Sequence, residues 1–143
     1  MPKTRVLIVD DEQEFAKTLA ERMQTRGLQA DAVFSGDEAL KAIKDKLFDV
    51  VVLDLAMPGM DGIETLKKML EVNPDLQVIM LTGRATVGKG VEAVKEGAFE
   101  FLEKPIQMEA LVDKIGKAKS RSTEISESRM TDMIDEIVKR RGW

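Results

Sequence analysis

Short apolar runs alternate along the chain with segments whose apolar residues recur at helical spacing. The runs span residues 6–9, 30–34, 50–53, 78–81 and 99–102, which is the length of ordinary strands. Runs 6–9 and 50–53 contain only valine, leucine and isoleucine, as is typical of strands buried on both faces. Because a helical segment follows each run, the pattern predicts an α/β fold of parallel strands joined by right-handed crossovers.

Cap and stop residues locate the ends of the first two helices. Gly27 stops the first helix, on which Phe15 is an apolar position. Ser35 is expected to cap the second helix, with Glu38 completing a capping box and Leu47 as the last residue of its apolar face.

The helix expected at about 87–95 contains Gly88 and Gly90. Each glycine costs a helix roughly 1 kcal/mol relative to alanine. A marginal helix is easier to remodel than a strong one, so this segment is a plausible moving part. The alternative is that the two glycines permit close packing.

The C-terminal residues differ from the rest of the chain. Residues 120–128 are polar and rich in serine, and an apolar stripe then returns at 130–138. The apolar register slips between Ile125 and Met130, so we expect a break or kink there. We therefore divide the chain into a domain at 1–121 and a tail at 122–143, made of a polar linker and a short amphipathic helix.

Composition narrows the chemistry. The 143 residues are 43% hydrophobic, enough for one compact domain and a short appendage. The net charge of −4 gives no reason to expect binding to nucleic acid or acidic lipid. No apolar stretch approaches the roughly 20 residues that cross a bilayer, and the first apolar run is too short for a signal peptide, so a cytoplasmic protein is expected. The absence of cysteine and histidine excludes disulfides, thiolate metal sites, Ser-His-Asp catalysis and a phosphohistidine on this chain.

Acids and other polar side chains follow the predicted strands. Asp10 and Asp11 end the first apolar run, and Asp54 ends the third. Thr82 and Lys104 follow the last two. The carboxyl ends of parallel strands lie at one edge of a sheet, where α/β proteins bind ligands, so we expect these residues to meet.

Taken singly, these residues have ordinary interpretations: Asp11 as a helix cap, Thr82 as a turn residue, Lys104 as an exposed loop residue. Together they form a site for a metal ion and a phosphoryl group. Asp11 and Asp54 suit direct ligation of Mg²⁺, and Asp10 suits a metal-bound water. Asp54 can also act as a nucleophile that forms an acyl phosphate, with Lys104 offsetting phosphoryl charge and Thr82 donating a hydrogen bond.

Four segments then carry a resemblance to a known family. They are Val-Leu-Ile-Val-Asp-Asp-Glu at 6–12, Asp-Leu-Ala-Met-Pro-Gly-Met-Asp-Gly at 54–62, Leu-Thr-Gly at 81–83 and Gly-Ala-Phe-Glu-Phe-Leu-Glu-Lys-Pro at 97–105. With these motifs in order and at family spacing, residues from about 3 to 119 resemble the receiver domain of two-component response regulators. The resemblance implies a flavodoxin-like, doubly wound sheet of five parallel strands in the order 2-1-3-4-5.

The resemblance also implies residue roles. Asp54 would be the phosphoacceptor and Lys104 the phosphate-sensing cation, in a site that uses Mg²⁺, with Mn²⁺ as a substitute. The backbone carbonyl of Ala56 would be a further metal ligand. Thr82 and Phe101 would form a switch pair, although tyrosine is commoner in the family at position 101, and a plain core phenylalanine stays open. The Lys104–Pro105 bond is expected to be cis. On phosphorylation, residues 83–95 are expected to gain protection from hydrogen exchange.

Three other classes of protein fit the sequence less well. A phosphatase of the haloacid-dehalogenase type needs a second acid two residues after its nucleophile, where this chain has Ala56. A nucleotide-binding protein needs a glycine-rich first turn, whereas Asp10, Asp11 and Glu12 would repel phosphate. A structural adaptor that ignores phosphate would be expected to lack Asp54, Asp11 or Lys104.

The expected partners follow from the absence of histidine. A sensor histidine kinase or a histidine phosphotransfer protein must supply the phosphoryl group. Output is expected through contacts with an unknown downstream protein rather than with DNA or a membrane. The stripe at 130–138 could dock on its own domain, pair with a second copy or bind that partner, and fluorescence of Trp143 would report its burial.

Overall fold

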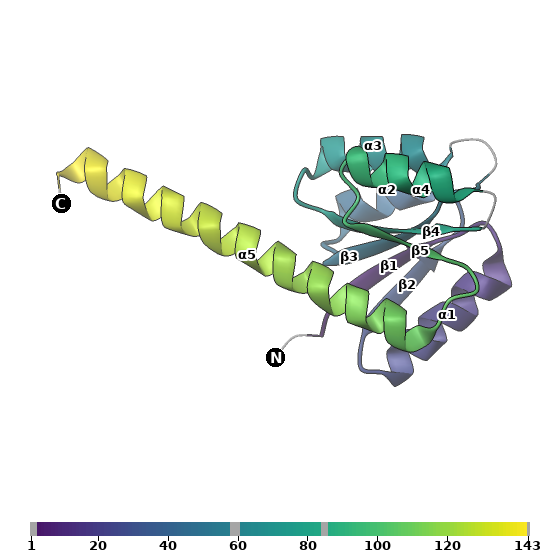
Figure 1. The fold of residues 1–143 in the computed structure, drawn as a ribbon. Coiled ribbons are helices and arrows are strands. Elements are labelled where there is room, and N and C mark those ends of the chain that lie inside the picture. Colours follow the sequence, from purple (N-terminus) through teal and green to yellow (C-terminus); the bar gives the residue numbers. More distant parts are fainter. Residues whose placement is uncertain (1–2, 58–60, 84–85, 143) are drawn as a thin grey trace.

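A central five-stranded parallel sheet organises the molecule, which is described by a computed structural model covering residues 3–57, 61–83 and 86–142 (Figure 1). The strands are β1 (Arg5–Val9), β2 (Gln29–Val33), β3 (Val50–Asp54), β4 (Gln77–Thr82) and β5 (Glu100–Glu103). The helices are α1 (Gln13–Thr25), α2 (Gly36–Asp45), α3 (Gly62–Val72), α4 (Val87–Lys95) and α5 (Met108–Arg141). The strand order β2-β1-β3-β4-β5 confirms the predicted topology. The Pro58-Gly59 turn and Trp143 lie outside the described residues.

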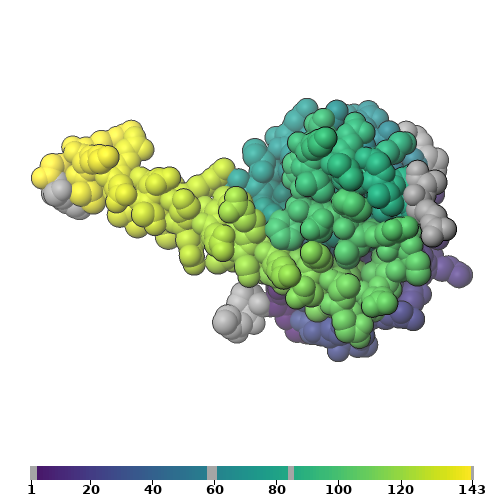
Figure 2. Space-filling model, viewed as in Figure 1, coloured from purple at the N-terminus to yellow at the C-terminus, as the bar shows by residue number. Residues whose placement is uncertain are grey.

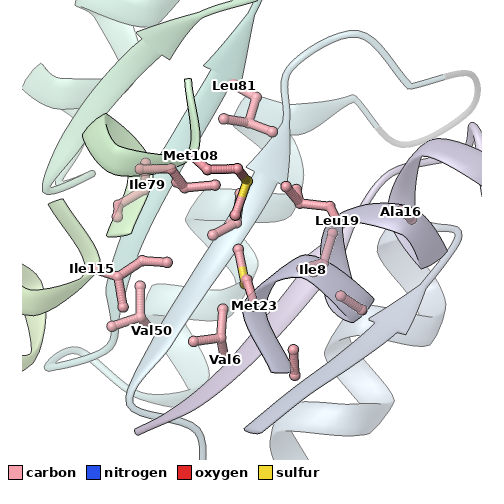
Figure 3. Close-up of a cluster of buried hydrophobic side chains, with 14 of the residues drawn as sticks. Val6, Ile8, Ala16, Leu19, Met23, Val50, Ile79, Leu81, Met108 and Ile115 are labelled. Atoms are coloured by element: carbon pink, nitrogen blue, oxygen red, sulfur yellow. The ribbon is translucent and has the colours of Figure 1, made fainter. Parts of the chain in front are cut away.

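Side-chain alternation along the strands builds two hydrophobic cores. Val6 and Ile8 of β1 belong to the core beneath α1 and α5, where they join Met23 and Ile115 (Figure 3). Residues one position along each strand, such as Leu7, point to the opposite face and pack beneath α2, α3 and α4. Since both faces are covered, β3 is apolar from Val50 to Leu53, as its sequence predicts.

The second helix ends earlier than expected. Ser35 caps α2 by accepting a hydrogen bond from the amide of Glu38 at 3.1 Å, as predicted. The carboxylate of Glu38 binds the amide of Phe34 at 2.9 Å rather than that of Ser35. Leu47, assigned from the sequence to the apolar face of this helix, lies beyond its end at Asp45 and is 81% exposed.

The predicted break in the C-terminal region is wrong. Helix α5 runs without interruption for 34 residues and extends beyond the body of the domain (Figures 1 and 2). The polar segment 120–128 is helical, because neither glycine nor proline occurs between Lys117 and Arg141. A slip of the apolar register changes which face is apolar, but it leaves the backbone hydrogen bonds intact. The boundary at residue 121 stays a prediction.

Arg129 attaches the extended part of α5 to the domain. Its guanidinium binds both carboxylate oxygens of Asp75, with Nη2 2.7 Å from Oδ1. Asp75 lies in the turn that precedes β4, at the edge of the sheet opposite the acidic residues. Beyond Arg129, the apolar side chains of α5 at Met130, Met133, Ile134 and Ile137 are exposed.

Candidate functional site

The carboxyl ends of four neighbouring strands bring the sequence-predicted residues together. Asp10 directly follows β1, and Asp54 is the last residue of β3. Thr82 is the last residue of β4, and Lys104 directly follows β5. Pairing of β1 with β3, β3 with β4 and β4 with β5 therefore gathers side chains that are up to 94 positions apart in the sequence.

Lys104 is the cation of this site. Its ammonium lies 3.3 Å from Oδ2 of Asp10 and 3.6 Å from Oδ1 of Asp54. The same nitrogen lies 4.7 Å from the centre of the Phe15 ring, on α1. The backbone amide of Lys104 donates to the carbonyl of Thr82 at 2.7 Å, which fixes the start of the loop that carries the lysine. The Lys104–Pro105 bond that follows is cis, as the resemblance implies.

The two partners of Lys104 differ in accessibility. Asp10 is fully buried, and its Oδ1 accepts the amide of Glu12 at 3.0 Å. Asp54 keeps 5% of its surface exposed, and its Oδ1 accepts the amide of Ala56 at 3.4 Å. Of these two carboxylates, only that of Asp54 therefore keeps surface in contact with solvent.

Burial sets the protonation preference of both acids. Burial raises the pKa of Asp10 above its ordinary 3.8, and the neighbouring Asp54 carboxylate raises it further. The hydrogen bond from the Glu12 amide and the charge of Lys104 lower this pKa, but they do not outweigh the increase. Burial likewise raises the pKa of Asp54, with Asp11 and Glu12 adding to it and Lys104 opposing. Burial alone would lower the pKa of Lys104, but the two carboxylates outweigh it and raise the pKa of the ammonium. One ammonium thus leaves this acidic site short of positive charge.

Asp11 completes an acidic cluster. It is exposed, and oxygens of Asp10, Asp11 and Asp54 all lie within 4.8 Å of one another. It is not a helix cap, because α1 begins after Glu12 and the cap position makes no side-chain hydrogen bond. The pKa is raised at two of these three carboxylates, Asp10 and Asp54. Such a cluster fits a hard divalent cation, which prefers oxygen ligands.

Thr82 on β4 and Phe101 on β5 are diagonal neighbours, because the residue opposite Phe101 is Met80. Thr82 is fully buried, and its hydroxyl donates to the carbonyl of Leu102 at 3.4 Å. Phe101 is half-buried against the core beneath α4. Both side chains contact the α4 backbone at Gly90, which makes this helix their common neighbour.

Sequence reasoning missed the contributions of three residues. Phe15 was recognised as an apolar helix position, but its ring also lies beneath the Lys104 ammonium. Gly62 was identified only as the last residue of the motif at 54–62, but a Cβ there would lie 2.6 Å from Cα of Leu55 and 2.7 Å from the carbonyl oxygen of Asp54. Helix α3 therefore begins against the backbone of the phosphoacceptor candidate. The third residue is Gly90, and no local signal distinguishes it from Gly88.

Comparison with known proteins establishes the family. Residues 6–116 match the family model of the response regulator receiver domain. The chain therefore belongs to this family, whose members are phosphoryl-accepting signalling switches of two-component systems and bind Mg²⁺ at an acidic pocket. Among the described residues, no helix is both long and apolar enough to cross a membrane.

Two transcriptional regulators are similar to this chain in sequence. The chain is 30% identical over 124 residues to the C4-dicarboxylate transport transcriptional regulatory protein DctD of Rhizobium meliloti, covering 87% of this chain and 27% of that protein. It is 33% identical over 143 residues to the DNA-binding transcriptional regulator NtrC of Salmonella typhimurium, covering 95% and 30%. It thus spans about 30% or less of the length of these two relatives.

A solved structure is similar over nearly its whole length. A response regulator receiver domain protein from Clostridium thermocellum superimposes with a TM-score of 0.83 at 29% identity, covering 85% of this chain and 98% of that one. The similarity therefore extends from the motifs to the arrangement of the sheet and helices.

Proposed function

We propose that Asp54 accepts the phosphoryl group. The observation that carries this assignment is that Asp54 alone among the three clustered acids combines contact with the Lys104 ammonium and a solvent-accessible surface. Asp10 contacts the same ammonium but is fully buried. Asp11 is exposed, and the described contacts of Lys104 do not include it.

The transfer is a nucleophilic substitution at phosphorus. A carboxylate oxygen of Asp54 forms the new O–P bond while the N–P bond of a partner's phosphohistidine breaks, and the departing imidazole retains the bonding electrons and takes up a proton. Lys104 offsets the charge on the phosphoryl oxygens. The chain supplies this chemistry itself but has no histidine, so the phosphoryl group must come from a histidine kinase or a histidine phosphotransfer protein. It is a signalling substrate rather than a turnover enzyme.

The residues present suit a bound Mg²⁺, with Mn²⁺ as a substitute. Asp11, Asp54 and the backbone carbonyl of Ala56 would hold it directly, and Asp10 would hold one of its waters. When bound, the ion neutralises carboxylate and phosphoryl charge. Support comes from the oxygen cluster and from the raised pKa of Asp10 and Asp54, because both indicate a site with surplus negative charge.

Thr82, Lys104 and Phe101 would report the phosphorylated state. The Thr82 hydroxyl points to Leu102 at 3.4 Å in this structure, and it would turn to a phosphoryl oxygen on Asp54. Phe101 would then follow into the space that Thr82 leaves. Output passes to a downstream protein that the sequence does not name, and the cytoplasmic location stays a prediction.

Intact-mass measurement tests the acceptor. The protein is incubated with Mg²⁺ and phosphoramidate, and one phosphate adduct is expected in the wild type and none in Asp54→Asn. Asp45→Asn, an exposed acid at the end of α2, is the matched control and should keep the adduct. An adduct that survives Asp54→Asn, or its absence from the wild type, contradicts the assignment.

A second candidate role belongs to the free end of α5, which we propose pairs with a second copy of this chain. Met130, Met133, Ile134 and Ile137 are between 48% and 65% exposed on one side of the helix, beyond its last described ion pair with the domain at Arg129. A copy of the same stripe is self-complementary in shape and polarity. Antiparallel pairing would place Glu127 near the basic end at 139–141, whereas parallel pairing would place like charges together.

Sedimentation equilibrium tests this pairing. Such a short stripe buries less area than a standard interface, so we expect dissociation in the micromolar range or weaker. Met133→Gln combined with Ile137→Gln should abolish the dimer. The matched control is Ser128→Gln combined with Thr131→Gln, which lies away from the stripe and should not. A wild type that stays monomeric at high concentration, or a dimer that tolerates the first pair of changes, contradicts the proposal.

A further inference from the structure

Two glycines of α4 have opposite surroundings. Gly88 is exposed, and an added Cβ there would meet no described atom within 4 Å. Gly90 is buried, and an added Cβ would lie 2.9 Å from Cγ2 of Thr82 and 2.9 Å from both Cγ and Cδ2 of Phe101. Such separations are shorter than the ordinary contact range of 3.4–4 Å. The missing side chain of Gly90 therefore leaves a notch in α4 that these two side chains fill.

Thr82 fills the notch with its methyl group while its hydroxyl faces the neighbouring strand. The hydroxyl donates to Leu102, and the methyl carbon contacts Gly90. Both groups are bonded to the same Cβ, so one rotation about χ1 moves them together. The hydroxyl cannot leave Leu102 without moving the methyl group in the notch.

Phe101 occupies the other side of the same notch. In the β4–β5 pairing, Met80 is opposite Phe101 and Thr82 is opposite Glu103, so the Phe101 ring lies two positions from Thr82 along the sheet edge. Two carbons of the ring face the position that a Gly90 side chain would occupy. If the Thr82 methyl group moves, the space that it leaves therefore borders both the Phe101 ring and the backbone of α4.

We propose that Gly90 is a positioning residue of the switch: its missing side chain makes the notch through which rotation of Thr82 is transmitted to Phe101 and to α4. The transmission rests on the proposed role of Thr82 as a phosphate sensor. The shared notch itself depends only on packing in the unphosphorylated protein. The notch and the transmission can therefore be tested separately.

Thermal unfolding of the metal-free protein tests the notch. Gly88→Ala and Gly90→Ala bring the same gain in helix propensity, so their difference isolates the contact. We expect Gly88→Ala to raise Tm and Gly90→Ala to lower it by several degrees. Thr82→Ser removes the methyl group but leaves the Phe101 ring in place, so Gly90→Ala should lower Tm less in that background than in the wild type. Equal effects of Gly90→Ala in both backgrounds would overturn the shared notch, and the double variant keeps the test valid if Gly90→Ala alone fails to fold.

Hydrogen exchange tests transmission. Wild type, Gly88→Ala and Gly90→Ala are each phosphorylated with phosphoramidate and Mg²⁺, and intact mass verifies the extent. All three should carry one phosphate, because the atoms nearest to a Cβ at Gly90 belong to Phe101 and Thr82 and not to the acidic cluster. The change in exchange over residues 86–95 should be present in the wild type and Gly88→Ala, and at least threefold smaller in Gly90→Ala. An equal change in Gly90→Ala, or none in a phosphorylated wild type, overturns transmission, whereas absence of any phosphate adduct counts against Asp54.

Discussion

The ammonium of Lys104 lies 3.3 Å from the fully buried carboxylate of Asp10, a residue 94 positions earlier in the chain. Removing the only cation that pairs with a buried carboxylate is destabilising, because it leaves the buried charge uncompensated. The pair therefore links the stability of the metal-free protein to the residue that we propose senses phosphate.

Removing the ammonium should destabilise the protein. Lys104→Met keeps most of the aliphatic stem but leaves Asp10 and Asp54 without their cation. We expect a loss of about 2 kcal/mol of unfolding free energy in EDTA, less than for a fully buried pair because the lysine side chain is 25% exposed. Lys117→Met, which breaks an exposed pair with Asp113 on α5, should cost less than about 0.5 kcal/mol. Urea denaturation compares the two, and equal losses would contradict the prediction.

Removing one acid should have the opposite effect. Asp10→Asn preserves shape, and it eliminates a carboxylate whose raised pKa reflects unfavourable burial of its charge. The variant should unfold at a higher temperature than the wild type in EDTA and should bind Mg²⁺ more weakly by calorimetry. Asp132→Asn, on the exposed end of α5, should change neither. Unchanged Mg²⁺ affinity in Asp10→Asn would argue against its place in the metal site.

The advantage of Asp10→Asn should depend on pH. The folded-state pKa of Asp10 is raised above its ordinary 3.8, so the folded protein binds this proton more tightly than the unfolded chain does. The stability due to the bound proton is fully present below the ordinary pKa and is lost as pH rises through the folded pKa. The unfolding free energy of Asp10→Asn minus that of the wild type should therefore grow as pH rises from the ordinary pKa of 3.8 through the raised folded-state pKa of Asp10. A difference that shrinks over this range would reverse the inferred sign.

Gly62 should resist substitution more than an exposed helical glycine. A Cβ there would lie 2.6 Å from Cα of Leu55 and 2.7 Å from the carbonyl oxygen of Asp54, and backbone atoms cannot rotate away. Gly62→Ala should cost about 2 kcal/mol of unfolding free energy and slow phosphorylation by displacing Asp54. Gly116→Ala on α5, with no described atom within 4 Å of the new Cβ, should instead gain up to about 1 kcal/mol. Chemical denaturation and the rate of adduct formation measure both effects.

Arg129 should hold α5 to the domain without contributing much to global stability. Arg129→Ala removes a bidentate pair to Asp75, but the arginine is largely exposed, so the cost should stay below about 1 kcal/mol. Local opening should rise more clearly, with faster hydrogen exchange over residues 122–130. Arg140→Ala, which breaks only a pair within the helix to Glu136, should leave exchange in that range unchanged. Equal exchange over residues 122–130 in Arg129→Ala and Arg140→Ala would contradict the role of the Asp75 pair in holding α5 to the domain.

The parts of this molecule that the sequence predicts are those set by periodicity and topology. Wholly apolar strands and the helices between them determine the sheet, and the sheet brings Asp10, Asp54 and Lys104 together although each looks ordinary alone. The Ser35 cap was predictable because it is a local hydrogen bond between neighbouring residues.

Contacts between distant backbones were not predictable. Gly88 and Gly90 are equivalent in sequence, and only the approach of β4 and β5 to α4 makes one of them a packing site. The continuity of α5 was missed because a change of apolar face was taken as a change of backbone. Side-chain register determines what a helix contacts, whereas the absence of glycine and proline determines whether it continues.

The uninterrupted helix α5 gives the domain a lever arm. Its 34 residues measure about 50 Å at 1.5 Å per residue. A tilt of about 5° at its base would move its tip by about 4 Å, so a small rearrangement near β4 is enlarged with distance. Each inserted residue would also rotate the far end of the helix by about 100°. The number of residues in α5 therefore determines the direction, relative to the domain, in which a partner bound at that end would face.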